Sequence, residues 1–306
     1  MPAGRLLVAL RVLGILPDAQ AWRRFLDRLT LFAGATALGT AVIFFVAANW
    51  TAIGRFGKFA LVEALVIAAV AVYAALGPER ASSKAALLAA TLALGALLAF
   101  VGQTYQTGAD TFELFSSWSA LMLPWVLLAC MPAMWVLWLA VVNLAVAFYF
   151  AVFGGLFGIL LSTEQMLWAL AAFNTAALLV WETAATRLAW LRERWAPRLL
   201  AVASGAVVTM LALQRVVDLR DVSRTILVVY PAWLALGYVV YRRAIPDLFM
   251  LAGGCLSIIA VVTTFLARHL LDDDAAGGSL LIGLVVIGMA GAAAVWLRQV
   301  ASEEQT

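Results

Sequence analysis

The chain has few of the residues on which catalysis and metal binding usually depend. Its 306 residues include one histidine, His269, and two cysteines, Cys130 and Cys255. Two cysteines without C-x-x-C spacing are too few for a disulfide framework or a thiolate metal site, and we expect both to be small buried side chains. The lone histidine lies in a predicted outer loop, whereas both cysteines lie inside apolar segments, so no nucleophile and base pair is expected. The sequence therefore predicts no metal, no cofactor and no enzyme.

Charge is also scarce, because only 12% of the residues are charged whereas 65% are hydrophobic. With a mean hydropathy of +1.02, such a chain cannot hide its apolar side chains in a water-soluble core and needs lipid as its solvent. The net charge of +3 comes without an uninterrupted basic run, so no nucleic-acid partner is expected. The composition predicts an all-α, polytopic transmembrane helical bundle whose first partner is the lipid bilayer.

Apolar stretches long enough to cross a membrane recur along the whole chain. A spanning helix needs about 20 mostly apolar residues. Ten stretches qualify, at residues 30–48, 58–76, 85–101, 114–130, 133–153, 165–185, 198–214, 224–241, 247–267 and 279–297. The glycine-containing stretch 152–164 is interpreted as a connector, although it could instead extend the fifth span.

These spans divide the chain into four parts. Residues 1–29 form a cytoplasmic lead-in that contains a short amphipathic helix, with Trp22 and Phe25 on its apolar face. Membrane helices follow at 30–153 and 154–297, and residues 298–306 form a short cytoplasmic tail. Fourteen of the twenty basic residues fall on the side of the two termini, so both ends are predicted to be cytoplasmic.

Three strings in the first half of the chain carry a family resemblance. They are PDAQAWRRFLDRL at 17–29, FFVAANWTAIGRFGKFAL at 44–61 and GALLAFVGQTYQTGADTFELFSSWSALMLPW at 95–125. In this order and spacing they resemble the bacterial predicted membrane proteins of domain of unknown function 2157, over about residues 15–150. The resemblance implies a multi-pass protein of the bacterial inner membrane without an established activity, so it carries over no site residues.

Polar residues interrupt the apolar sequence in two predicted outer loops. The residues concerned are Asn49, Trp50, Arg55 and Lys58 in the first loop, and Gln103, Tyr105, Gln106, Asp110 and Glu113 in the second. If the loops meet, Arg55 or Lys58 can pair with Asp110 or Glu113 in a polar vestibule. Alternatively, Asp110 and Glu113 cap the next helix, Asn49 and Trp50 form an interfacial helix end, and Arg55 and Lys58 are solvated loop charges.

Two carboxylates lie within predicted spans. Glu63 is about five residues, or roughly 7 to 8 Å, inside the second span from its outer end. A charged carboxylate costs about 2.5 to 3.5 kcal/mol at the bilayer centre. It therefore favours a buried partner, a water-filled cavity or protonation, unless it reaches the interface. Glu182, near the inner end of the sixth span, is expected to be more easily solvated.

The sequence supports two functional hypotheses. The first is a non-enzymatic membrane component that acts in envelope sensing or assembly, alone, as a homo-oligomer or with other membrane proteins. The alternative is a small-solute transporter or channel that uses the outward-facing polar patch together with Glu63.

Overall fold

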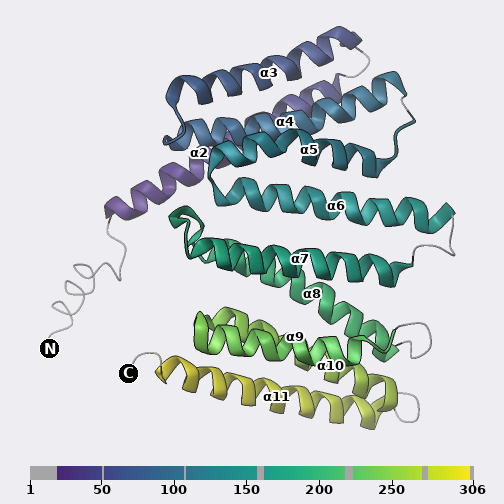
Figure 1. Ribbon diagram of the computed structural model, residues 1–306. Helices are drawn as coiled ribbons and strands as arrows, with labels where there is room; N and C mark the ends of the chain where they lie inside the picture. The colour runs from purple at the N-terminus through teal and green to yellow at the C-terminus, as the bar shows by residue number, and fades with distance from the viewer. Residues whose placement is uncertain are drawn as a thin grey trace. The chain divides into compact units, whose positions relative to one another are not determined.

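The structure, a computed structural model, describes residues 19–49, 52–106, 108–156, 162–217, 223–270 and 275–303. Within these ranges the chain forms ten α-helices, one short 3-10 helix and one π-helical turn, and it contains no strand (Figure 1). The predicted all-α fold is confirmed.

All ten predicted spans are helices in the structure. Nine helices of the described ranges are long and apolar enough to cross a membrane. The remaining one, α9 (Ile226–Val239), has only 14 residues and continues into the π-helical turn Val240–Ala244. The sequence therefore predicted the number of helices, whereas this π-helical ending has no signature in the apolar pattern.

The chain divides into two compact units, Met1–Ala145 and Val146–Thr306. The boundary falls inside α6 (Pro132–Leu156), which extends past the predicted end of the fifth span at Phe153. The remaining residues of the predicted connector up to 161 lie outside the described ranges. Each unit is considered separately below.

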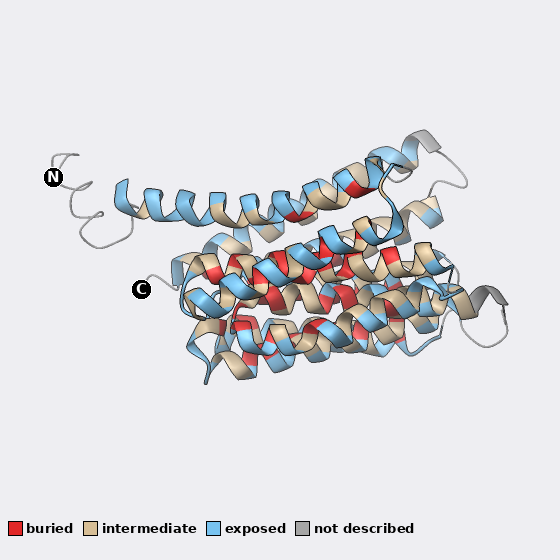
Figure 2. Cartoon of the chain, turned by 90° about the horizontal axis from the view of Figure 1, so that it is seen from above, coloured by how far each residue is buried: buried red, intermediate tan, exposed pale blue. Residues whose placement is uncertain are grey.

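In the N-terminal unit, α4 (Ala81–Tyr105) is the central helix. It packs against α2 (Ala19–Ala48), α3 (Arg55–Leu76) and α5 (Thr111–Ala129). Many of its buried residues are alanine, and small side chains allow helix backbones to approach closely. Buried residues recur along the helices between intermediate and exposed ones (Figure 2).

One glycine of α4 is required by this close packing. A Cβ atom added at Gly95 would lie 2.5 Å from Cε2 of Trp118 on α5. The Trp118 indole N–H donates to the carbonyl oxygen of Thr91 at 2.9 Å, which fixes the ring against α4. The glycine therefore makes room for an aromatic side chain that joins the two helices.

The first described helix, α2, is continuous from Ala19 to Ala48. The structure has no break near Leu29, so the predicted lead-in helix and the first span share one helix, while residues 1–18 lie outside the described ranges. Thirty residues extend about 45 Å, which exceeds the hydrocarbon thickness of about 30 Å. The charged first turns of α2 therefore fit beyond the hydrocarbon.

The C-terminal unit contains α7 (Thr163–Ala185), α8 (Trp195–Val217), α9, α10 (Leu248–Leu270) and α11 (Ala275–Glu303). Helix α8 packs against α7 and α10, and α10 also packs against α11. At the start of α7, the Ser162 hydroxyl accepts from the backbone N–H of Gln165 at 3.2 Å, while the Gln165 side chain accepts from the Ser162 N–H at 2.9 Å. This reciprocal pair is a capping box, which stabilises the helix start.

The structure places one of the two cysteines where the sequence did not predict it. Cys255 is partly buried in α10, but Cys130 is exposed, so the prediction that both are buried is wrong for Cys130. The reason is its position, because Cys130 ends α5 in a left-handed conformation (φ 43°) where the chain turns toward α6.

Candidate functional site

Asn49, the first residue of the predicted vestibule, lies at the end of helix α2. The side-chain amide of Asn49 donates to the carbonyl oxygen of Phe45 at 2.9 Å. The carbonyl oxygen of Asn49 accepts from the backbone N–H groups of Ala52 and Ile53 at 3.1 and 2.9 Å. Asn49 thus ends α2 and forms the following turn, while Trp50 lies outside the described ranges.

The two predicted loops lie at the same end of the N-terminal unit. The rings of Phe59, in the first turns of α3, and Tyr105, at the end of α4, stack with centroids 6.0 Å apart. One turn earlier, the Arg55 guanidinium lies over the Phe56 ring at 4.9 Å. Lys58 is buried, whereas Arg55 and Tyr105 are exposed. The aromatic contact therefore joins the start of α3, which follows the first loop, to Tyr105 of the second loop.

The acidic residues of the second loop form a helix cap. Asp110 and Glu113 make a capping box at the start of α5, in which the Asp110 backbone N–H donates to the Glu113 carboxylate at 3.1 Å. Gln103 and Gln106 are exposed at the end of α4. Across the described ranges, no ion pair joins Arg55 to Asp110 or Glu113. The predicted helix cap of Asp110 and Glu113 is confirmed, whereas the interfacial anchoring of Asn49 and Trp50 and the solute-binding vestibule stay predictions.

Glu63 lies on the outward side of α3. Its side chain is exposed, while its neighbour Val62 is buried in the core of the unit. The carboxylate therefore faces away from the helices of the N-terminal unit.

A cluster of charged residues around two buried carboxylates lies instead in the C-terminal unit. Nη1 of Arg194 donates to both oxygens of Glu182, at 2.8 and 3.0 Å, and the Tyr241 hydroxyl donates to the same carboxylate at 3.2 Å. Glu182 is buried, so the prediction that it is easily solvated is wrong. The reason is the segment between α7 and α8, which places Arg194 over the end of α7.

Asp247, between the π-helical turn and α10, completes this cluster. Its side chain is 1% exposed and accepts from Nε of Arg194 and Nε of Arg198, each at 3.1 Å. The backbone N–H of Phe249 donates to its other oxygen at 3.1 Å. Burial by itself would raise the pKa of Asp247, but hydrogen bonds and charge from Arg198 and Arg194 outweigh it and lower this pKa below its ordinary value. The carboxylate is therefore charged at neutral pH.

We call Glu182, Arg194, Arg198, Tyr241 and Asp247 the ionic cluster. Its two arginines and two carboxylates balance in charge, and Arg194 joins both carboxylates. Sequence analysis missed the cluster, since its ion pairs join residues 12 to 53 positions apart. One signal was present: Pro246 interrupts the helical pattern directly before Asp247, so a buried carboxylate could begin α10.

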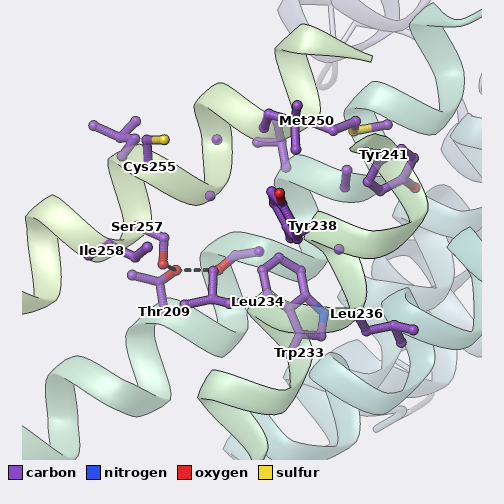
Figure 3. A pocket seen from close by; sticks show the side chains of 18 of the residues that line it. Thr209, Trp233, Leu234, Leu236, Tyr238, Tyr241, Met250, Cys255, Ser257 and Ile258 are labelled. Atoms are coloured by element: carbon purple, nitrogen blue, oxygen red, sulfur yellow. Dashed lines mark hydrogen bonds between the residues drawn. The ribbon is translucent and has the colours of Figure 1, made fainter. Parts of the chain in front are cut away.

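A crevice lies beside the ionic cluster. It has a volume of about 570 Å³ and is lined by residues of α7, α8, α9 and α10, the π-helical turn and Trp296 of α11 (Figure 3). Glu182, Tyr241 and Phe249 line it near the ionic cluster, and most other lining side chains are aliphatic or aromatic. The volume falls within the range of small-molecule sites, about 300 to 1,000 Å³.

Hydroxyl groups lie at the other end of the crevice. Thr209 and Ser257 are joined at 2.7 Å, and the Tyr230 hydroxyl is 2.9 Å from that of Ser257. These bonds connect α8, α9 and α10, as polar side chains often do between membrane helices. They also satisfy the hydroxyl groups among themselves, which leaves the crevice predominantly apolar.

Glycines help to keep the crevice open. Gly237 of α9 and Gly253 of α10 both line it, and a Cβ atom added at either would meet nothing within 4 Å. Along α10 the lining extends from Phe249 to Ala260, which is about 16 Å at 1.5 Å per residue. This length is about half of the 30 Å hydrocarbon core, so the lining along α10 is about as long as one bilayer leaflet is thick.

The described helices define a multi-pass α-helical membrane protein, since nine of them have the length and hydropathy of membrane spans. Residues 13–135 match the model of a family described as predicted membrane protein (DUF2157), which confirms the resemblance in the first half of the chain. No curated protein and no solved structure matches the chain. The ionic cluster and the crevice lie outside the family match.

Proposed function

We propose that the chain is a non-enzymatic component of the bacterial inner membrane, with both termini in the cytoplasm, that acts in envelope sensing or assembly by binding a lipid. The observation that carries this proposal is the crevice of the C-terminal unit. Its lining is predominantly apolar and, along α10, about as long as one leaflet is thick. A hydrocarbon chain is the occupant that such a surface favours, because burial of apolar area drives binding.

The polar groups around the crevice support binding rather than catalysis. Each carboxylate of the ionic cluster accepts hydrogen bonds from arginine, and the hydroxyls of Thr209 and Ser257 bond to each other. A general base or nucleophile needs a free lone pair directed at a substrate. Groups that are engaged with one another in this way serve to hold helices in place.

The binding proposal can be tested by filling the crevice. Gly253→Phe places a ring in the open space next to α10, whereas Gly283→Phe places the same ring on α11, where the added Cβ also meets nothing within 4 Å but the residue lies outside the crevice. Native mass spectrometry of the detergent-purified full chain should show retained lipid in wild type and Gly283→Phe, and loss of that lipid in Gly253→Phe. Equal retention in all three folded proteins would contradict the proposal.

Solute transport is the second candidate. The observation that favours it is the stacking of Phe59 on Tyr105, which brings both polar loops to one end of the N-terminal unit. A cysteine at position 63, in a background with Cys130 and Cys255 replaced by serine, should then react with a membrane-impermeant thiol reagent added from outside. Protection of this cysteine in intact cells would argue against a water-filled path to Glu63.

A further inference from the structure

The end of the C-terminal unit that holds the ionic cluster is rich in arginine. Segments 182–198, 241–247 and 298–303 contain seven arginines and four carboxylates, a net formal charge of +3. The ion pairs between Arg194 and Asp247 and between Arg242 and Glu303 join these segments at one end of the helices. Arg187, Arg192 and Arg243 are exposed there. Basic side chains at a membrane interface attract anionic lipid headgroups.

Arg198 links this basic end to the crevice. Its guanidinium lies 5.6 Å from the centroid of the Phe249 ring, and Phe249 lines the crevice. In the described contacts, Arg198 reaches Asp247 through Nε only, and its side chain is 43% exposed. The N–H groups of its two terminal nitrogens can therefore donate to a group outside the protein, and this fork suits phosphate oxygens.

The negative charge of Glu182 does not prevent an anion from binding at this end of the crevice. Its carboxylate receives two hydrogen bonds from Arg194 and one from the Tyr241 hydroxyl. The charge of Glu182 is thus matched within the ionic cluster, and the excess charge nearby comes from exposed arginines.

We propose that the crevice selects an anionic glycerophospholipid, with one acyl chain inside the crevice and the phosphate beside Arg198. This inference rests on the proposed lipid binding and adds the headgroup to it. Two independent features support one occupant: the apolar lining along α10 is about as long as one leaflet is thick, and its interfacial end is basic. A zwitterionic lipid would fill the crevice equally well but would gain less from the arginines.

The selection can be measured by competition. The purified full chain is mixed with equal amounts of phosphatidylglycerol and phosphatidylcholine that carry the same acyl chains, and bound lipids are counted by native mass spectrometry. Wild type should prefer phosphatidylglycerol. Arg198→Gln should lower this preference about fivefold, the contribution of one basic residue near an anionic surface, while Arg198→Lys should retain most of it. Arg268→Gln, at the opposite end of α10, is the matched control and should not change it.

The outcomes separate the headgroup from the chain. Equal binding of both lipids, with loss of both in Gly253→Phe, would overturn headgroup selection but keep the proposed function. A preference for phosphatidylglycerol that Gly253→Phe leaves unchanged would place the lipid on the charged surface and overturn the crevice site. Absence of retained lipid in wild type would overturn the proposed function itself. If Arg198→Gln does not fold, raising the salt concentration from about 0.1 to 1 M should abolish the wild-type preference by screening, and an unchanged preference would overturn the inference.

Discussion

The two units differ in how their polar residues are satisfied. In the N-terminal unit, most polar residues that stand out in the sequence lie at exposed helix ends, where Asn49 ends α2 and the Asp110–Glu113 pair begins α5, although Lys58 is buried. In the C-terminal unit, charged residues scattered through an apolar sequence meet in the ionic cluster. A run of polar residues therefore forms a turn and a helix cap in the N-terminal unit, whereas charged residues up to 53 positions apart form the ionic cluster in the C-terminal unit.

The physical reason is the distance between partners along the chain. Glu113 finds its partner three residues away, so its bond forms as soon as the helix starts. Arg194 and Asp247 are 53 residues apart, and their pairing needs the packing of several helices. Exposed interactions of the first kind contribute little, whereas breaking a buried ion pair is costly. We therefore expect mutations in the ionic cluster to lower stability more than mutations at the exposed helix ends of the N-terminal unit.

The largest effect is expected from Arg194→Ala. This change removes the donor shared by Glu182 and Asp247 and leaves two buried carboxylates with fewer partners. Breaking a buried pair typically costs about 3 to 5 kcal/mol, so the variant should unfold at a clearly lower denaturant concentration than wild type. Equilibrium unfolding in detergent, followed by tryptophan fluorescence, measures the difference.

The matched control for Arg194→Ala lies in the N-terminal unit. Arg55 is exposed and contacts the Phe56 ring, so Arg55→Ala should change the free energy of unfolding by less than about 0.5 kcal/mol. Similar losses in the two variants would remove the proposed distinction between the units.

Gly95→Ala should have the next largest effect. The added methyl group would lie 2.5 Å from an atom of the Trp118 ring, and overpacking of this kind costs about 1 to 3 kcal/mol. In Gly34→Ala on α2, the added Cβ meets nothing within 4 Å, and stability should stay the same or rise because alanine favours a helix. Thermal unfolding of the two variants side by side checks the prediction. Equal midpoints would show that Trp118 moves aside without cost.

Glu113 tests the capping interpretation directly. Glu113→Ala removes the acceptor for the Asp110 backbone N–H and should cost about 1 kcal/mol, as lost helix caps do. Glu113→Gln retains an acceptor oxygen and should remain close to wild type, because glutamine also serves at this position of a capping box. The free energies of unfolding of both variants test whether Glu113 acts as a helix cap. If Glu113→Gln destabilises as much as Glu113→Ala, the negative charge is needed and the vestibule hypothesis gains support.

Sequence reasoning predicted the helices better than the site. Apolar runs of about 20 residues are a local property, so α2 to α8, α10 and α11 all coincide with predicted spans. The capping boxes at Ser162 and at Asp110 were also predictable, since their partners are three residues apart. In contrast, the burial of Glu182 depends on Arg194, which reaches it from a loop.

The crevice could not be predicted for a related reason. Gly237 and Gly253 look like ordinary membrane-helix glycines in the sequence, and only packing shows that open space adjoins both of them. The π-helical turn that follows the short α9 holds Tyr241, whose hydroxyl donates to Glu182, 59 positions away in the sequence. Local patterns thus specify which segments are helices, and tertiary packing specifies where space and charge remain.

The last expected effect depends on pH, because the titration of Asp247 leaves stability unchanged at ordinary pH and lowers it only in acid. Because its pKa is lowered in the folded protein, its ionisation stabilises the fold fully above the unfolded pKa of about 3.9, and this contribution is lost as the pH falls through the lower folded pKa. In Asp247→Asn the side chain cannot ionise, so this contribution to stability is absent at every pH. The difference in unfolding midpoint between wild type and Asp247→Asn should therefore be constant from about pH 8 to 5 and should shrink below about pH 4. Scanning fluorimetry of both proteins measures it, with Asp110→Asn as the control for an exposed carboxylate of the N-terminal unit. A difference that grows on acidification would have the wrong sign for a carboxylate held by Arg194 and Arg198, and would mean that burial outweighs the two arginines.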